Sequence, residues 1–363
     1  MKKGIGMFLA FMVMCMGLAG CKGSSRTESQ AGGEFKNGER ITKKLTDQVT
    51  LDAEIELPES WDGTVETCKV KSDFYDGEEQ APQMFPDIPK EDWQTYDDRD
   101  IGGKTAAVYS GKIRIEEDQE QQPGFIYVGM SVSVFTERGQ AMATLPSHVI
   151  SDSFVPDEST RQEFSFSTVE AAAEKAQQYL MEKTGAEEFR FLTFYSVTDE
   201  ELNERQKESD EAMGLDGNDY QWTQKDCFYD LWFEQLVNGL PLVSDPPVRK
   251  DKLYVPSGKA NVIYSENGIE YVAGGCGYQV LSQKAEKMAS MDQISTALER
   301  KFKMMTGVEI TISEMRLVYY PFPTSANELD YEYELIPAWC FSFEDIGTQQ
   351  VYINALTGVE IST

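Results

Sequence analysis

VEAAAEKAQQYLMEKTGAE, residues 169–187, is matched 122 residues later by MDQISTALERKFKMMTGVE, residues 291–309. In both stretches apolar residues recur at helical spacing, and a Thr-Gly pair follows the last turn. A glycine at that position commonly adopts the left-handed conformation that ends a helix. The agreement predicts an internal repeat with one amphipathic helix per copy. The apolar stripes are Val169, Ala172, Ala176 and Leu180 in the first copy and Met291, Ile294, Leu298 and Phe302 in the second.

Each helix also has a start signal, because Ser167 with Glu170 and Ser290 with Gln293 both have the spacing of a capping box. After each helix the sequence becomes strand-like, with Asn-Gly or Thr-Gly hairpin turns at 238–239, 267–268 and 357–358. We therefore expect two α+β units, residues 161–282 and 283–363, each with one helix packed on a small, mostly antiparallel sheet. The expected strands are 189–192, 229–237, 262–264 and 269–272, then 310–320, 331–335, 339–343, 351–353 and 359–361, with a charged helix inserted at 199–213.

The segment before the repeat, residues 41–160, is predicted to be a β-rich domain. Apolar and polar residues alternate over 49–57 and 126–134, and another strand is expected over 109–115. A Pro- and Asp-rich stretch at 82–100, which contains Trp93 and Tyr96, is interpreted as a long surface loop.

The N-terminal sequence indicates export. Lys2 and Lys3 precede an apolar run that is shorter than the roughly 20 residues a membrane-spanning helix needs. The run ends in Leu18-Ala19-Gly20-Cys21, which resembles a bacterial lipobox. The resemblance implies a signal peptide at 1–20, a lipid on Cys21, and anchorage on the extracytoplasmic face of the cell membrane. The Gly- and Ser-containing residues 21–40 are typical of a flexible tether.

Composition narrows the possible partners. The 363-residue chain has a formal charge of −29, which becomes −31 without residues 1–20. This charge argues against binding to nucleic acid or to an anionic membrane surface. Four cysteines remain beside Cys15 and Cys21, and they fit either free buried thiols or at least one disulfide: Cys68, Cys227, Cys276 and Cys340.

Several hairpins resemble those of a known family. Phe233–Leu242 and Tyr264–Gly268 are similar to the two hairpins of PepSY-type modules. Leu335–Trp339 and Tyr352–Gly358 resemble the C-terminal pattern of PepSY-like domains and of YycH and YycI, accessory proteins of a Gram-positive sensor kinase. The whole chain resembles uncharacterised lipoproteins of Clostridia-type Firmicutes. The resemblance implies a non-catalytic module that restrains a peptidase or modulates a partner; the lipid anchor in place of a transmembrane helix differs from YycH and YycI.

No catalytic, metal or cofactor motif is found in the sequence. His148 is the sole histidine, so no His-Glu-x-x-His zinc motif can form, and neither Cys-x-x-Cys nor Gly-x-Ser-x-Gly occurs. Lys183-Thr184-Gly185 matches a penicillin-recognising triplet without its companion motifs. Asp216–Asp219 matches part of a calcium loop and fits an ordinary acidic turn better. Paired carboxylates stay possible, because 62 acidic residues guarantee close pairs.

Aromatic residues are the candidate interaction residues. Packing on the two sheets is one interpretation, and a partner interface is the other, since aromatics dominate many contacts. The prolines around Tyr319–Pro323 predict that this stretch leaves its strand as a loop. The candidates are Tyr319, Tyr320, Phe322, Trp232 and Trp339.

Three functions follow from these patterns. The first is a non-catalytic, lipid-anchored protein that binds or modulates another envelope protein, such as a peptidase or sensor. The second is a lipoprotein that captures a peptide or small molecule for sensing or uptake. The third is a carboxylate-dependent enzyme acting on the cell envelope.

Overall fold

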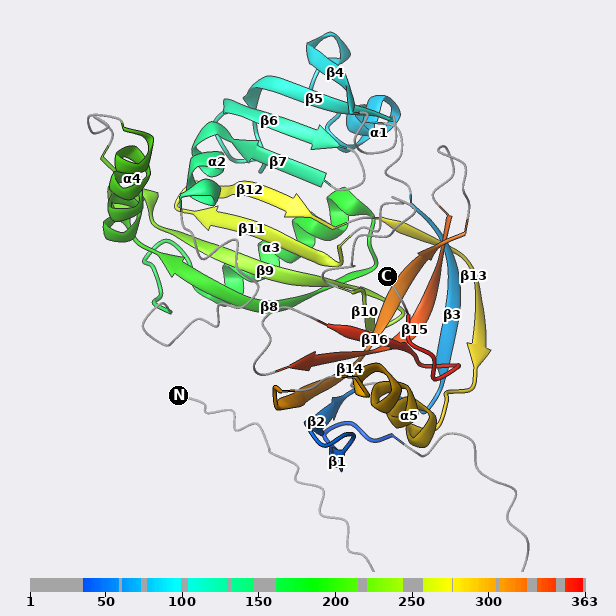
Figure 1. The fold of residues 1–363 in the computed structure, drawn as a ribbon. Helices are drawn as coiled ribbons and strands as arrows, with labels where there is room; N and C mark the ends of the chain where they lie inside the picture. The colour runs from blue at the N-terminus through cyan, green and yellow to red at the C-terminus, as the bar shows by residue number, and fades with distance from the viewer. Residues whose placement is uncertain are drawn as a thin grey trace, which may run out of the picture. The chain divides into compact units, whose positions relative to one another are not determined.

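The computed structural model forms a strand-rich α+β fold with two β-sheets (Figure 1). All of its helices and strands belong to one unit, Gly32–Thr363. The structure describes residues 35–58, 61–72, 77–98, 104–128, 132–145, 161–214, 221–243, 257–275, 277–304, 307–324, 332–343 and 350–361. The signal peptide, Cys21, His148, Cys276 and the acidic turn at 216–219 lie outside these residues, so the predictions made for them stay predictions.

The larger sheet has nine strands, and all its neighbours pair antiparallel. Its order is β10-β9-β11-β12-β7-β6-β5-β4, and β8 also pairs with β9. The strands are β4 (Trp93–Asp98), β5 (Lys104–Ile113), β6 (Gln122–Val128), β7 (Val132–Thr136), β8 (Glu188–Val197), β9 (Phe228–Val237), β10 (Leu240–Pro241), β11 (Lys259–Ser265) and β12 (Gly268–Gly274).

The smaller sheet has seven strands in the order β1-β2-β14-β15-β3-β13, and β16 pairs with β15. The pair β2–β14 is parallel, and the other pairs are antiparallel. The strands are β1 (Arg40–Lys44), β2 (Val49–Glu56), β3 (Val65–Ser72), β13 (Tyr278–Glu286), β14 (Ile310–Pro323), β15 (Glu332–Phe343) and β16 (Val351–Asn354).

One long helix packs on each sheet: α3 (Val169–Thr184) on the larger and α5 (Met291–Phe302) on the smaller. The predicted apolar stripe of α3 is buried, as are Ile294, Leu298 and Phe302 of α5. Ser290 and Gln293 form the predicted capping box, whereas the cap of α3 is Thr168 rather than Ser167. Ser167 instead bonds the Thr168 carbonyl. The other helices are α1 (Gly77–Met84), α2 (Glu137–Thr144) and α4 (Asp199–Met213), with 3-10 turns at Lys90–Asp92 and Gln224–Asp226.

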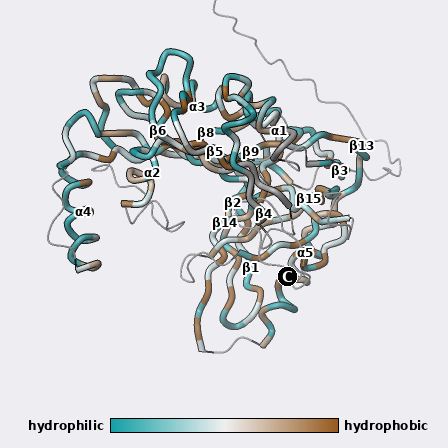
Figure 2. The backbone as a smooth tube through the Cα atoms, turned by 90° about the horizontal axis from the view of Figure 1, so that it is seen from above, coloured by the Kyte–Doolittle hydropathy of each residue, from teal (hydrophilic) through white to brown (hydrophobic). Residues whose placement is uncertain are grey.

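The two copies of the repeat share a topology. After α3, strands β8, β9, β11 and β12 follow one another as antiparallel neighbours. After α5, strands β14, β15 and β16 are likewise antiparallel neighbours in chain order. An antiparallel bridge between Ile353 and Glu360 then begins a fourth strand. The inserted helix α4 is confirmed, and it is largely hydrophilic (Figure 2).

The segment 41–160 does not form a sheet of its own. Its strands β1–β3 join the smaller sheet, because β2 pairs with β14 and β3 pairs with both β13 and β15. Its strands β4–β7 join the larger sheet through the pairing of β7 with β12. The predicted domain boundary at residue 160 would therefore divide both sheets, because strands on either side of it pair with one another. The predicted loop at 82–100 was also wrong, because it contains the end of α1, a 3-10 turn and β4.

A charged cluster joins the two sheets. Glu234 of β9 is fully buried and forms salt bridges with Arg190 of β8 and with Arg316 of β14. Glu56 of β2 lies at the half-exposed outer side of this cluster, with its carboxylate 3.2 Å from the Arg190 guanidinium. One carboxylate thus holds a guanidinium from each sheet. A continuous hydrophobic core also includes residues of both sheets.

Candidate functional site

The predicted interaction residues are mostly in the core. Tyr319, Tyr320 and Trp339 are at most 1% exposed, so they are not available to a partner. The predicted loop at 319–323 was wrong, because these residues lie in β14 and pair with β15. The prolines are tolerated because β2 pairs with β14 only as far as Arg316 and Leu242 bridges it only at Tyr319, so no described strand pairs with that side of β14 at Pro321 or Pro323. Phe322 is 37% exposed, and Trp232 is half-buried on β9.

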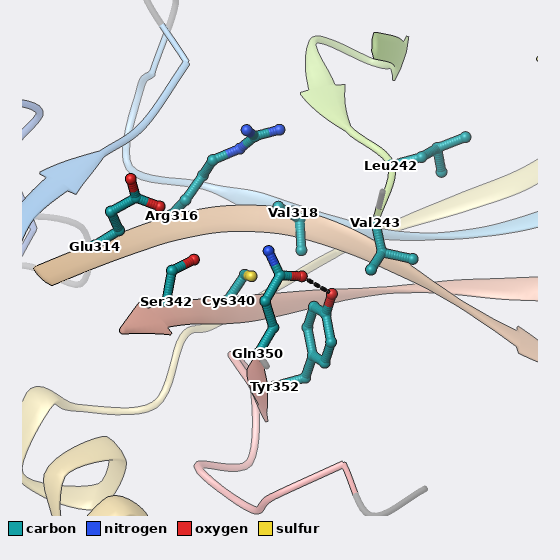
Figure 3. Close-up of a pocket in the computed structure, with 9 residues that line it drawn as sticks. All are labelled: Leu242, Val243, Glu314, Arg316, Val318, Cys340, Ser342, Gln350 and Tyr352. Carbon is teal, nitrogen blue, oxygen red and sulfur yellow. Dashed lines mark hydrogen bonds between the residues drawn. The ribbon is translucent and has the colours of Figure 1, made fainter. Parts of the chain in front are cut away.

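A small cavity of about 40 Å³ lies beside these strands (Figure 3). Arg316, Cys340 and Gln350 line it, and Tyr352 donates a hydrogen bond to Gln350. Burial raises the pKa of the Cys340 thiol to about 12. The thiol is therefore protonated at neutral pH and is a poor nucleophile. Cys68, Cys227 and Cys340 are all free and buried.

A larger groove of about 720 Å³ runs along one face of α3. α3 forms the first wall. The end of β5 with residues 114–118 and Gln121 forms the second wall, and residues 84–89 with Asp92 form the third wall. We call it the α3 groove. These segments meet because α1 lies beside β5 (Figure 1) and Lys183 of α3 donates to the carbonyl of Met84 at the end of α1.

The floor of the α3 groove is apolar and aromatic. Phe85, Tyr109, Ile113, Ile115 and Tyr179 line it, and each is at most 8% exposed. The Tyr179 hydroxyl is buried without a hydrogen-bond partner in the described part of the chain. Burial, followed by the charges of Glu182 and Glu116, raises the pKa of this phenol. It is therefore a neutral hydroxyl, and its oxygen is not exposed to the groove.

Two lysines flank Tyr179 on the same face of α3, because residues four apart lie one above another. The Lys183 ammonium donates to the Met84 carbonyl at 3.1 Å and lies over the Phe85 and Tyr179 rings. The Lys175 ammonium donates to the Tyr264 hydroxyl at 3.1 Å, and this bond raises the pKa of Lys175. Both lysines are therefore occupied by neighbours rather than directed into an empty space.

At the Lys175 end, the α3 groove continues into a second hollow, which we call the acidic arm. The two share Glu116, Asp118 and Lys175. The other wall of the acidic arm is the turn between β11 and β12. Its carboxylates are Glu116, Asp118, Glu120 and Glu266.

A second buried polar site lies away from the groove. Asp230 of β9 is 0% exposed, and its side chain lies on the sheet face opposite to Tyr229 and Leu231, since alternate residues face opposite sides. Asn261 donates a hydrogen bond to one carboxylate oxygen. Burial raises the pKa of Asp230 to about 7, while Asn261 and the Trp232 indole act in the opposite direction.

Neither feature was predicted from the sequence. Lys175, Tyr179 and Lys183 recur every four residues, and this spacing could have marked a second functional face on α3. An aspartate within the apolar run 228–237 could have marked Asp230. Over the described residues, no helix is long and apolar enough to cross a membrane, and His, Cys, Asp and Glu form no group of three or more suited to a metal ion.

Comparison with known proteins supports the fold only. No protein-family model and no curated protein matches the chain. An uncharacterized protein from Eubacterium rectale has a similar solved structure, with a TM-score of 0.60 and 17% sequence identity. The match covers 89% of this chain and 93% of that one. At this identity the similarity shows the fold alone, and the resemblance to PepSY and YycH modules stays a prediction.

Proposed function

We propose that this protein is a lipid-anchored, extracytoplasmic binding protein without catalytic activity, which holds an extended segment of another envelope protein in the α3 groove. The anchor in this proposal is the lipid on Cys21, and the two helix-and-strand units are its PepSY-like modules. The acidic body, with a formal charge of −29, keeps the folded part away from anionic lipid.

The α3 groove is the observation that carries the proposal. Binding sites combine an apolar floor with a few directed polar groups, and the groove has both. The lining follows α3 from Lys175 to Lys183, which favours an extended chain over a compact metabolite.

A photo-cross-linker in the groove tests this function. We expect p-benzoylphenylalanine in place of Gln178, which is exposed and lines the groove, to form an adduct with one envelope protein in irradiated cells. Mass spectrometry should place the cross-link in a single short segment of that protein. Glu174 is the matched control, because it is also exposed on α3 but does not line the groove.

Equal adducts from both positions, or none from Gln178, would contradict the proposal. An adduct from Gln178 to a free peptide of low mass would instead support the second function, the capture of peptides for sensing or uptake.

A further inference from the structure

The smaller sheet ends in an open edge at β13. This strand pairs with β3 on one side, and no described strand pairs with its other side (Figure 1). Residues 281–285 are all exposed, although alternate residues of a strand point to opposite faces, and Leu281 is 47% exposed. Neither face of this stretch is therefore covered by the described part of the chain. An uncovered edge offers its unpaired backbone N–H and C=O groups to another strand.

The charges on β13 are arranged so that the strand can pair with itself. Lys284 and Glu286 lie on the same face, two residues apart, and form a salt bridge along the strand. A lone lysine on an edge discourages a neighbouring strand, because its charge has no partner there. The glutamate two residues away changes this result. When a second β13 runs antiparallel with Ala285 opposite Ala285, each Lys284 lies opposite Glu286 of the second copy.

The charges also select the register of this pairing. Moving its centre by one residue places Lys284 opposite Lys284, or Glu286 opposite Glu286, and like charges directly opposite each other are unfavourable. In the favourable register residues 282–288 of the two copies lie side by side. Leu281, the bulge residue of β13, lies just beyond the end of this stretch. Since a bulge interrupts a ladder of strand hydrogen bonds, the bulge and the charges delimit the same seven residues.

The other edge of the same sheet lacks this complementarity. The charged residues of β1 are Arg40, Lys43 and Lys44, which are all positive. A second β1 beside the first would bring cations together, and each of the three already forms a salt bridge with a carboxylate outside the strand. Self-complementary charge is therefore a property of β13 and not of both edges of this sheet.

We infer that β13 is a self-association surface, along which two copies of this chain pair antiparallel about a two-fold axis at Ala285. The two smaller sheets then form one continuous sheet across the dimer. A two-fold contact of the same patch on both subunits is the commonest arrangement in soluble oligomers. The inference goes beyond the proposed function, because the α3 groove lies on the larger sheet and either proposal can fail alone.

A cysteine at the axis tests the arrangement of the dimer. Ala285→Cys places two thiols opposite each other, so a short bis-maleimide should convert the mature chain into a covalent dimer. Gln279→Cys is the matched control, because Gln279 is exposed on the same strand but lies roughly 40 Å from its counterpart in this register. The control should stay monomeric in a denaturing gel. The wild-type chain measures any background from the native cysteines.

Charge reversal tests the register independently. Lys284→Glu should raise the Kd of the dimer about tenfold in sedimentation equilibrium, because two attractive pairs become repulsive. Adding Glu286→Lys should restore the wild-type Kd, since the opposite charges then face each other again. Lys287→Glu is the control for net charge, because Lys287 is exposed but lies opposite the uncharged Gln283 of the second copy. Its Kd should stay close to that of the wild type.

A chain that stays monomeric up to its solubility limit would overturn the inference, and so would equal cross-linking of the two cysteine variants. A double variant as weakly associated as Lys284→Glu would also contradict it. A cross-link from position 285 to a different envelope protein in cells would assign the edge to another partner and overturn the inference as well. None of these results affects the adduct from Gln178, which tests the α3 groove separately.

Discussion

Asp230→Asn is expected to raise the free energy of unfolding above that of the wild type, and this gain should be up to about 4 kcal/mol larger at pH 8 than at pH 4. The carboxyl is fully buried and its pKa in the folded state is raised to about 7 from 3.8. One pKa unit corresponds to about 1.4 kcal/mol, and about three units give the stated value. The unfolded chain releases the proton above pH 4, whereas the folded chain keeps it until about pH 7. The stability contributed by this group therefore falls as the pH rises through that window.

Asparagine keeps the shape and the acceptor for Asn261 but has no proton to lose, so the variant should escape this decrease. Urea unfolding at pH 4, 6 and 8 measures the difference. Asp226→Asn is the contrasting control, because Asp226 is also buried but pairs with Arg138 at 3.1 Å. It should destabilise the protein at pH 8. If the free energy of unfolding of Asp230→Asn differs from that of the wild type by the same amount at all three pH values, Asp230 is ionised in the folded state and the prediction is wrong.

Glu234→Gln is expected to lower the free energy of unfolding by about 3 kcal/mol. Removing one partner of a buried ion pair typically costs about 3–5 kcal/mol, and the lower end applies because Arg190 and Arg316 are partly exposed. Two guanidiniums would be left beside each other without the buried carboxylate between them. Because one hydrophobic core includes residues of both sheets, unfolding should stay a single transition, shifted to lower denaturant concentration.

Glu56→Gln is the matched control for Glu234→Gln. Glu56 contacts the same two arginines, but its side chain is 52% exposed. Exposed ion pairs contribute about 0–1 kcal/mol, so this variant should unfold in a single transition close to that of the wild type. Similar losses in the two variants would mean that the burial of Glu234 adds nothing to the connection between the sheets.

Local features of the fold could be predicted because neighbouring residues determine them. The stripes of α3 and α5, the Ser290 capping box and the turn at Asn267-Gly268 depend on a few adjacent positions, and the structure confirms each of them. The partners of the strands could not be predicted. The alternation over 49–57 shows that one face is buried, but not that its neighbour is β14.

The same limit applies to the candidate site. The spacing of Lys175, Tyr179 and Lys183 is visible in the sequence, but the groove exists only because residues 84–92 and 114–121 come from elsewhere in the chain to lie beside α3. The burial of Tyr319 and Tyr320 also depends on strands that are distant in the sequence, so it could not be predicted either. Prolines next to aromatics fit both a loop and an edge strand, and only the neighbours of β14 decide between them.

The parallel pairing of β2 with β14 has a consequence for how the protein is made. Val49 lies opposite Ile310, so β2 leaves the ribosome roughly 260 residues before its partner does. During that time one edge of β2 lacks the strand it will pair with, and slow closure of such distant pairs favours aggregation. The chain therefore depends on its C-terminal third to complete its first strands, and a product that stops before Ile310 leaves β1 and β2 unpaired with the rest of the smaller sheet.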